Sequence, residues 1–198
     1  PDINLGWLPK KGVHKFNPWA AEGKETTLTI NEDRSRYIQN NNEELDQIIF
    51  IGGSLTQGWA VDDKETFSYY LQTKYNNYKF LNFGVGGYGG YQSLLTLERI
   101  FKEKKNIKHI IYGFIPHHEV RNVAAGSWLY LLNGVSKRGV VELPYASVNK
   151  KGQLNRNQST KYIKLPLSEY SALVAKIEKK IMKIKSYVRE KDQPRISL

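Results

Sequence analysis

The stretch Gln47-Ile-Ile-Phe-Ile-Gly-Gly-Ser-Leu-Thr-Gln-Gly58 carries the clearest structural signal of this chain. Its first five residues form a short apolar run ending at a glycine pair, a pattern typical of a strand buried on both faces. Glycines at 52 and 53 remove the Cβ atoms that would obstruct a tight turn from strand to helix. The stretch therefore predicts a buried strand followed directly by Ser54, which stands clear of the sheet.

The same alternation of strand and helix continues along the chain. The residue pattern predicts a helix over 66–75, a strand over 78–83, a helix over 91–104 and a third buried strand over 107–115. Strands that alternate with helices form βαβ units and a parallel sheet, so the fold class is α/β. Ligands of such sheets bind at the carboxyl ends of the strands. Every unusual loop of this sequence falls at one of those ends, which favours an active site there.

The flanking regions are less regular. Residues 1–45 are rich in Asn, Glu and Lys, and we predict an N-terminal arm with one short strand over 26–30. Residues 46–198 form the α/β domain, with an insertion at about 119–165 that contains a hairpin over 140–154. The last residues, 193–198, resemble the approach to a fourth strand. Since three parallel strands make a small sheet, we expect the domain to be incomplete at its C-terminus and to continue beyond this chain.

The longest helix signal covers residues 167–191 and is amphipathic. Basic residues occupy other positions of the helix, among them Lys176, Lys179, Lys180, Lys183 and Arg189. We expect the apolar face to pack in a core, with a helix lying on a membrane surface as the alternative. The residues of this face are Tyr170, Leu173, Val174, Ile177, Ile181, Ile184 and Val188.

Composition excludes several classes of protein. The chain has 198 residues, of which 40% are hydrophobic and 16 are glycine, as in an ordinary globular domain. It contains no cysteine, so disulfides and thiolate metal sites are excluded. No apolar run reaches the roughly 18 residues of a membrane-spanning helix. The polar arm, the absent initial methionine and the lack of cysteine fit an exported or membrane-tethered extracytoplasmic protein.

The net charge of +11 is unevenly distributed. Residues 1–65 hold 7 Lys and Arg against 11 Asp and Glu, whereas residues 66–198 hold 23 against 8. A basic half suits nucleic acid, anionic lipid or an acidic polysaccharide, and a solvated lysine-rich surface is the simplest interpretation. We expect no nucleic-acid partner, because Tyr187 is nearly the only aromatic residue among the lysines of the long helix.

A second glycine-rich loop, Asn82-Phe-Gly-Val-Gly-Gly-Tyr-Gly-Gly90, follows the second strand. It superficially resembles a dinucleotide fingerprint, but it is the second βα turn, and no acidic residue ends a strand about 20 residues further on. We therefore expect no cofactor. Backbone N–H groups of such a loop can instead approach a substrate closely.

The third segment, Gly113-Phe-Ile-Pro-His-His-Glu-Val-Arg-Asn122, follows the third strand. Its position beside two glycine loops makes His117 and His118 candidates for lining a site, with a hydrogen-bonded structural role as the alternative. A metal site is not expected, because adjacent histidines point in different directions and no third ligand is evident.

In order and spacing, these three segments resemble blocks I to III of the SGNH (GDSL) hydrolases over residues 46–122. The resemblance implies a three-layer α/β/α fold of the flavodoxin-like type, with Ser54 as nucleophile. It also implies that the N–H groups of Ser54 and Gly87 form the oxyanion hole. His117 stands where the family usually has Asn, and Gly53 replaces the Asp of the first block.

The general base of that family lies in a C-terminal Asp-x-x-His, and no histidine follows His118 in this chain. Three readings remain open: the base lies beyond Leu198, His118 substitutes for it, or the domain is not catalytic. The expected function is a serine hydrolase or acyltransferase acting on an ester, with the O-acyl group of a carbohydrate as a candidate substrate. The alternative is a non-catalytic carbohydrate-binding domain of the same fold. Nucleic-acid binding through the basic helix is a third reading.

Overall fold

The computed structural model describes residues 2–18, 25–40, 42–136, 140–149 and 151–191. The chain divides into two compact units. Residues 8–118 form the first, here named the sheet unit, and residues 1–7 with 119–198 form the second, here named the C-terminal unit. All the candidate site residues belong to the sheet unit: Ser54, Gly87, His117 and His118.

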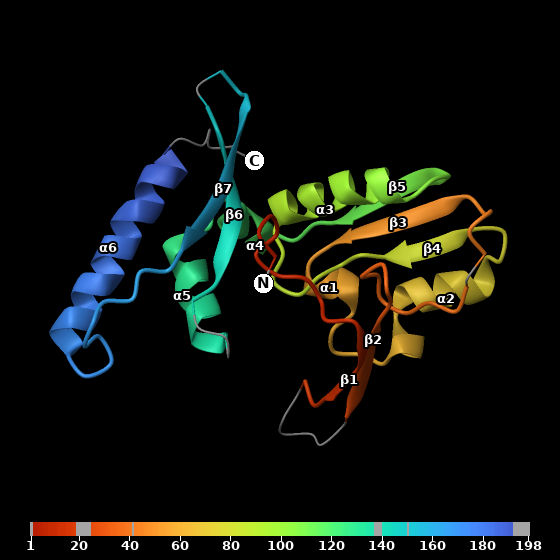
Figure 1. Ribbon diagram of the computed structural model, residues 1–198, viewed down its shortest axis with the longest axis horizontal. Coiled ribbons are helices and arrows are strands. Elements are labelled where there is room, and N and C mark those ends of the chain that lie inside the picture. The colour runs from red at the N-terminus through yellow and green to blue at the C-terminus, as the bar shows by residue number, and fades with distance from the viewer. Residues whose placement is uncertain (1, 19–24, 41, 137–139, 150, 192–198) are drawn as a thin grey trace. The chain divides into compact units, whose positions relative to one another are not determined.

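A three-stranded parallel sheet lies at the centre of the sheet unit (Figure 1). Its strands are β3 (Gln47–Gly52), β4 (Lys79–Asn82) and β5 (Ile107–Gly113), in the order β4-β3-β5. The pairing is parallel on both sides of β3. The predicted α/β class with a parallel sheet is therefore confirmed, and the first strand occupies the central position.

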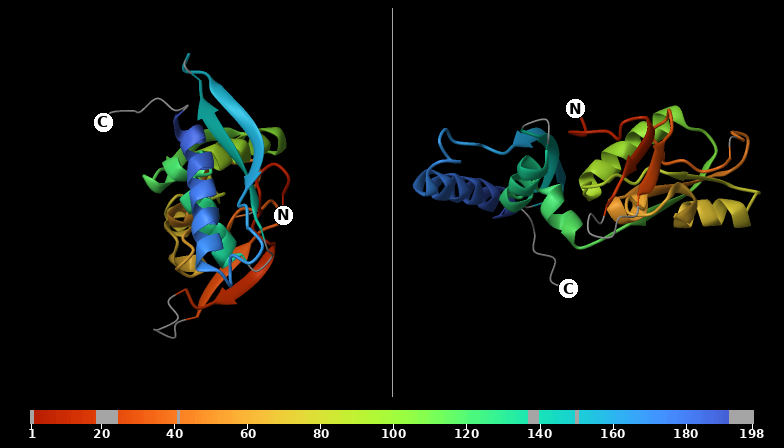
Figure 2. Two further views of the ribbon diagram at one scale, coloured as in Figure 1. Left: turned by 90° about the vertical axis from the view of Figure 1, so that its left-hand side faces the viewer. Right: turned by 90° about the horizontal axis from the view of Figure 1, so that it is seen from below.

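Helices pack on both faces of this sheet. The other elements of the sheet unit are β1 (Gly12–Phe16), β2 (Thr26–Ile30), α1 (Ser54–Gln57), the 3₁₀ helix η1 (Asp63–Glu65), α2 (Phe67–Lys74) and α3 (Gly90–Glu103). Side chains of β3 alternate between the faces: Ile49 packs with Ile100 of α3, and Phe50 packs in a cluster with Leu71 of α2. The two helices consequently lie on opposite sides of the sheet, as the right-hand view of Figure 2 shows.

The third strand differs from its prediction, because it is exposed rather than buried. Ile110, Ile111 and Tyr112 are all exposed in β5. Edge position alone is not the cause, because β4 is the other edge strand and is buried, with α2 packed against it. No helix of the described residues covers Ile110 and Ile111 in the same way. An apolar run does not show which strand a neighbouring helix covers, so the sequence could not predict this difference.

The C-terminal unit combines a hairpin with two helices. Its elements are α5 (Gly126–Val135), β6 (Glu142–Val148), β7 (Leu154–Lys161) and α6 (Ala172–Lys191), and α4 (His117–Asn122) leads into it. β6 and β7 pair antiparallel, which confirms the predicted hairpin, although its second strand extends to Lys161, beyond the predicted end at 154. Its core contains Leu129 of α5, Leu143 of β6 and Met182 of α6. α5 was not predicted, because its continuous apolar run from 128 to 132 has no helical spacing.

The long helix α6 departs from its prediction in two ways. It begins at Ala172 rather than at 167, because Leu167 takes a φ of 65° and residues 166–170 form turns. In addition, Leu173, Ile177 and Ile184 are exposed, so the expectation that they pack in a core is wrong. Met182 is buried in their place. None of the helices in the described ranges has the length and apolar character needed to cross a membrane.

The N-terminal region contains the predicted strand over 26–30, which is β2 and pairs antiparallel with β1. The segment over 193–198, expected to approach a fourth strand, lies outside the described residues.

Candidate active site

The candidate residues lie in the three loops that follow the parallel strands. Ser54 is the first residue of α1, directly after β3, and is half-buried. Gly87 lies in the turn between β4 and α3 and has a φ of 85°. His117 and His118 begin α4 after β5. Because the three strands are parallel, these loops share one edge of the sheet.

The first loop is packed tightly against the ends of β3 and β5. Gly52 has a φ of 150°, and a Cβ there would lie 2.3 Å from Thr56 Oγ1 and 2.8 Å from the carbonyl oxygen of Gly113. A Cβ on Gly113 would lie 2.1 Å from the same Thr56 hydroxyl. Thr56 is buried, so α1 rests on two glycines that pair with each other across the strands. Only glycine permits this close approach, which fixes the start of α1 and hence Ser54.

Two amide side chains join the first loop to the second. Asn82, which is fully buried at the end of β4, donates from Nδ2 to the Thr56 carbonyl oxygen at 2.7 Å, and its Oδ1 accepts from the N–H of Gly84 at 2.9 Å. Gln57 Oε1 accepts from the N–H of Gly86 at 3.0 Å. A Cβ on Gly84 would lie 2.4 Å from the backbone nitrogen of Gln57. The residue before Gly87 is therefore hydrogen-bonded to the helix that Ser54 begins.

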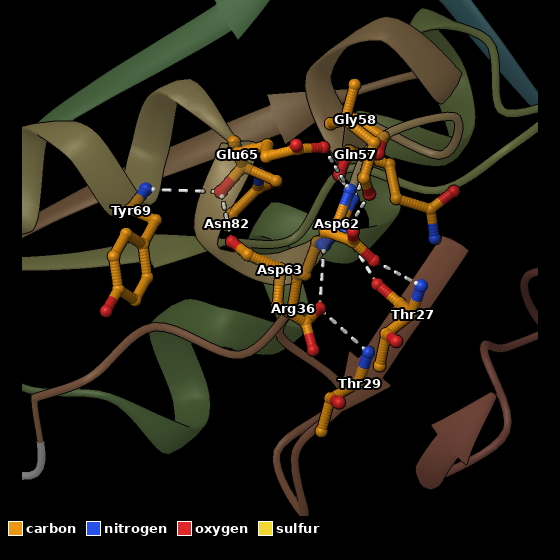
Figure 3. A network of polar contacts seen from close by, with 12 residues as sticks. Thr27, Thr29, Arg36, Gln57, Gly58, Asp62, Asp63, Glu65, Tyr69 and Asn82 are labelled. Carbon is orange, nitrogen blue, oxygen red and sulfur yellow. Dashed lines mark hydrogen bonds and ion pairs between the residues drawn. The ribbon is translucent and has the colours of Figure 1, made fainter. Parts of the chain in front are cut away.

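A buried arginine holds the chain that leaves α1 (Figure 3). Arg36 is 1% exposed, and its Nε lies 3.3 Å from Asp63 Oδ1. Burial lowers the pKa of Arg36, and Asp63 opposes that effect. The guanidinium also donates to four backbone carbonyl oxygens, those of Thr27, Gln57, Gly58 and Val61.

The aspartates of the next segment extend this network to β2. Asp63 Oδ1 accepts from the N–H of Thr29 at 2.9 Å, and Asp62 Oδ1 accepts from the N–H of Thr27 at 2.6 Å. Arg36 and these carboxylates thus attach the loop after Ser54 to a strand more than 20 residues earlier in the sequence. None of the side chains that fix this loop is among the candidate site residues.

The two histidines occupy different environments. His118 is 0% exposed, and its Nδ1 lies 2.6 Å from the hydroxyl oxygen of Tyr112. Its ring also lies edge-on to Phe114, with centroids 5.8 Å apart. His117 is exposed at the same end of β5. The hydrogen bonds of the described residues include none between Ser54 and either histidine, so the histidines lie at the same edge of the sheet as the serine without pairing to it.

Sequence reasoning did not identify Arg36, Gln57, Asn82 or Tyr112. Asn82 carried a usable signal, because an Asn two residues before a glycine at a strand end often accepts a hydrogen bond from that backbone N–H. The partners of Arg36 lie 9 to 27 residues away along the chain, and no local pattern indicates them.

The surroundings of the site contain no recognisable metal centre: no three His, Asp or Glu side chains gather as metal ligands within the described ranges. A hollow of about 320 Å³ is lined by residues 164–170, and therefore involves none of the candidate residues. Comparison of the chain with models of protein families finds no match, and comparison with curated proteins finds none.

Proposed function

We propose that residues 46–122 are the nucleophile-bearing part of a serine hydrolase or acyltransferase of the SGNH type, in a three-layer α/β/α fold. One observation supports this most strongly: Ser54 begins a helix directly after the central strand, and that helix is hydrogen-bonded through Gln57 to the glycine loop that contains Gly87. A nucleophile and an oxyanion donor must be held in one fixed geometry, and a hydrogen bond between the two loops supports such an arrangement.

In the proposed reaction, Ser54 Oγ attacks the carbonyl carbon of an ester and loses its proton. The tetrahedral intermediate collapses to an acyl-enzyme, and the leaving alcohol takes up a proton. Water then releases the acyl group as an acid in a hydrolase, or a second alcohol accepts it in an acyltransferase. The second step restores the serine hydroxyl, so atoms and protons balance.

The oxyanion is assigned to two backbone N–H groups, those of Ser54 and Gly87. The first residues of a helix leave their N–H groups without partners inside the helix, which leaves the N–H of Ser54 suited to this role. The positive φ of Gly87 gives that peptide an orientation that other residues adopt only with strain. Preorganised donors of this kind contribute roughly 3–4 kcal/mol each to transition-state stabilisation.

The histidines receive different roles. His117 is exposed and would line the site as a hydrogen-bond donor to substrate. His118 is buried against Tyr112 and Phe114, so we assign it a positioning role for the start of α4. The four assigned residues do not include the Asp-x-x-His base that the resemblance implies.

The substrate class is an ester, and specifically the O-acyl group of a carbohydrate. The excess of positive charge in residues 66–198 would favour an acidic glycan over a neutral one. Release of acetate from O-acetylated acidic and neutral polysaccharides, measured at low and at physiological salt, tests this preference.

The assay for the reaction itself is hydrolysis of p-nitrophenyl acetate by the protein and by two serine variants. Ser54→Ala should lower the rate at least about a thousand-fold. Ser127→Ala is the matched control, because Ser127 is an exposed serine in the first turn of α5, also preceded by glycine. Full activity in Ser54→Ala would refute the proposed nucleophile.

A second candidate is a non-catalytic domain of this fold that binds carbohydrate. It is favoured by the environment of His118, whose Nδ1 faces a tyrosine hydroxyl, whereas a catalytic histidine is usually oriented by a carboxylate. This candidate predicts saturable binding of a glycan that survives Ser54→Ala, together with no turnover of any ester.

A further inference from the structure

The exposed face of α6 combines aliphatic side chains with lysines. Leu173, Ile177, Ile184 and Tyr187 are 68%, 45%, 56% and 60% exposed. Their spacing of four, seven and three residues places them along one side of the helix. The opposite side packs inside the C-terminal unit through Glu178 and Met182, both buried. The exposed stripe is therefore separate from the side that stabilises this unit.

Positive charge surrounds this stripe. Between residues 172 and 187 the helix has five lysines, all exposed, and a single acidic residue, Glu178. That carboxylate is occupied by the Tyr162 hydroxyl and by the N–H of Leu165, at 2.7 Å from the latter. Lys180 lies within the stripe itself, since it is three residues after Ile177 and four before Ile184. The lysines are Lys176, Lys179, Lys180, Lys183 and Lys185.

We propose that this face of α6 binds the surface of an anionic lipid bilayer, with the helix lying parallel to the membrane plane. The charge complementarity supports this occupant: lysines attract acidic headgroups while their alkyl stems extend alongside the inserted aliphatic groups. Tyr187 belongs to the aromatic residues enriched at the membrane–water interface. The surface of α6 would then sit at the boundary between headgroups and acyl chains.

A nucleic acid fits the same face less well. Binding to phosphates needs the lysines alone, and it would leave three large aliphatic side chains exposed beside the bound backbone. Bases of a nucleic acid would stack on an aromatic ring, but the ring of Tyr130 in α5 already contacts Lys179, whose ammonium lies 5.3 Å from the ring centroid. Of the two ligands, only a lipid surface would bury the aliphatic stripe.

The test is co-sedimentation of the full chain with vesicles of phosphatidylcholine alone or mixed with phosphatidylglycerol. We expect binding to the mixed vesicles and little to phosphatidylcholine. Ile177→Ser and Ile184→Ser should each weaken binding roughly ten-fold, and Lys180→Gln about five-fold. Ile and Ser have similar helix propensities, so these exposed substitutions leave α6 folded, as circular dichroism can verify.

Two matched variants control for general loss of apolar area or charge. Val13→Ser removes a comparably exposed aliphatic side chain from β1, and Lys105→Gln removes an exposed lysine from the sheet unit. Both should bind as the unchanged protein does. Absence of binding to mixed vesicles would overturn the proposal.

Two other results would also overturn it. Binding that Lys180→Gln weakens and both serine variants leave unchanged would be purely electrostatic, as for a nucleic acid. Self-association in the absence of lipid that Ile177→Ser abolishes, measured by analytical ultracentrifugation, would identify the stripe as an interface between copies of this chain.

Discussion

Replacing Arg36 with methionine should release the loop that follows Ser54. The guanidinium is buried and holds five acceptors: Asp63 and four backbone carbonyl oxygens. Methionine has a similar reach and fills much of the same space, but it donates no hydrogen bond. The substitution thus leaves a carboxylate and several peptide oxygens without these donors, while the apolar packing changes little.

The expected loss of unfolding free energy follows from the number and burial of these contacts. Losing one partner of a buried ion pair costs about 3–5 kcal/mol, because the other charge stays buried. The lost bonds to carbonyl oxygens add to this, and relief from burying the guanidinium subtracts from it. We therefore expect the sheet unit to lose about 3–5 kcal/mol of unfolding free energy, a large part of the stability of a small domain.

The assay is urea denaturation combined with hydrogen exchange of peptides from each unit. Exchange in residues 54–66 should accelerate by roughly a hundred-fold to several thousand-fold in Arg36→Met, while peptides of α5 and α6 should change little. Arg34→Met is the control, since Arg34 donates a single hydrogen bond, to the Pro9 carbonyl oxygen at 2.9 Å. A loss below about 1 kcal/mol in Arg36→Met, or an equal loss in the control, would refute this account of the network.

Three further outcomes can be measured on the same protein. Gly84→Ala should displace the backbone of Gln57, because the added Cβ would lie 2.4 Å from its nitrogen. The variant should lose about 2 kcal/mol of stability and melt at a lower temperature, and an unchanged melting temperature would contradict this. Burial raises the pKa of Asp33, but hydrogen bonds from Lys104 and Ser35 outweigh it, so the pKa is lowered overall. Its contribution to stability is therefore present above the ordinary value of 3.8 and lost as pH falls below that value. Asp33→Asn should therefore flatten the acid limb of a stability–pH curve, and an identical limb would oppose this. Glu178→Gln should destabilise the C-terminal unit by about 1–3 kcal/mol, because the carboxylate accepts hydrogen bonds from the Tyr162 hydroxyl and the Leu165 N–H. Urea denaturation that shows no such loss would contradict this prediction.

The central elements of the sheet unit were predictable because their signals are local. The apolar runs at 47–51 and 78–83 coincide with β3 and β4, which pack against each other and against α3. Burial was predicted less well. β5 is apolar yet lies at the edge of the sheet, and α6 turns Ile177 and Ile184 outward, because neither pattern encodes which neighbour covers an apolar face.

The candidate site was likewise predictable only in part. Its position at the carboxyl ends of the strands follows from topology, so the loops that contain Ser54, Gly87 and the histidines could be named from the sequence. The contacts that fix those loops could not, since they join distant segments: Gln57 to Gly86, and Arg36 to four carbonyl groups. Such partners depend on how the chain packs and have no periodic signature.

The role of Ser54 can be tested by measuring the intact mass of the protein after reaction with a fluorophosphonate. An activated Ser54 should add one phosphonyl group per chain, and the adduct should disappear in Ser54→Ala while persisting in Ser127→Ala. An adduct that survives Ser54→Ala would contradict the assignment of Ser54 as the nucleophile, and an unmodified chain would contradict activation of Ser54 within residues 1–198.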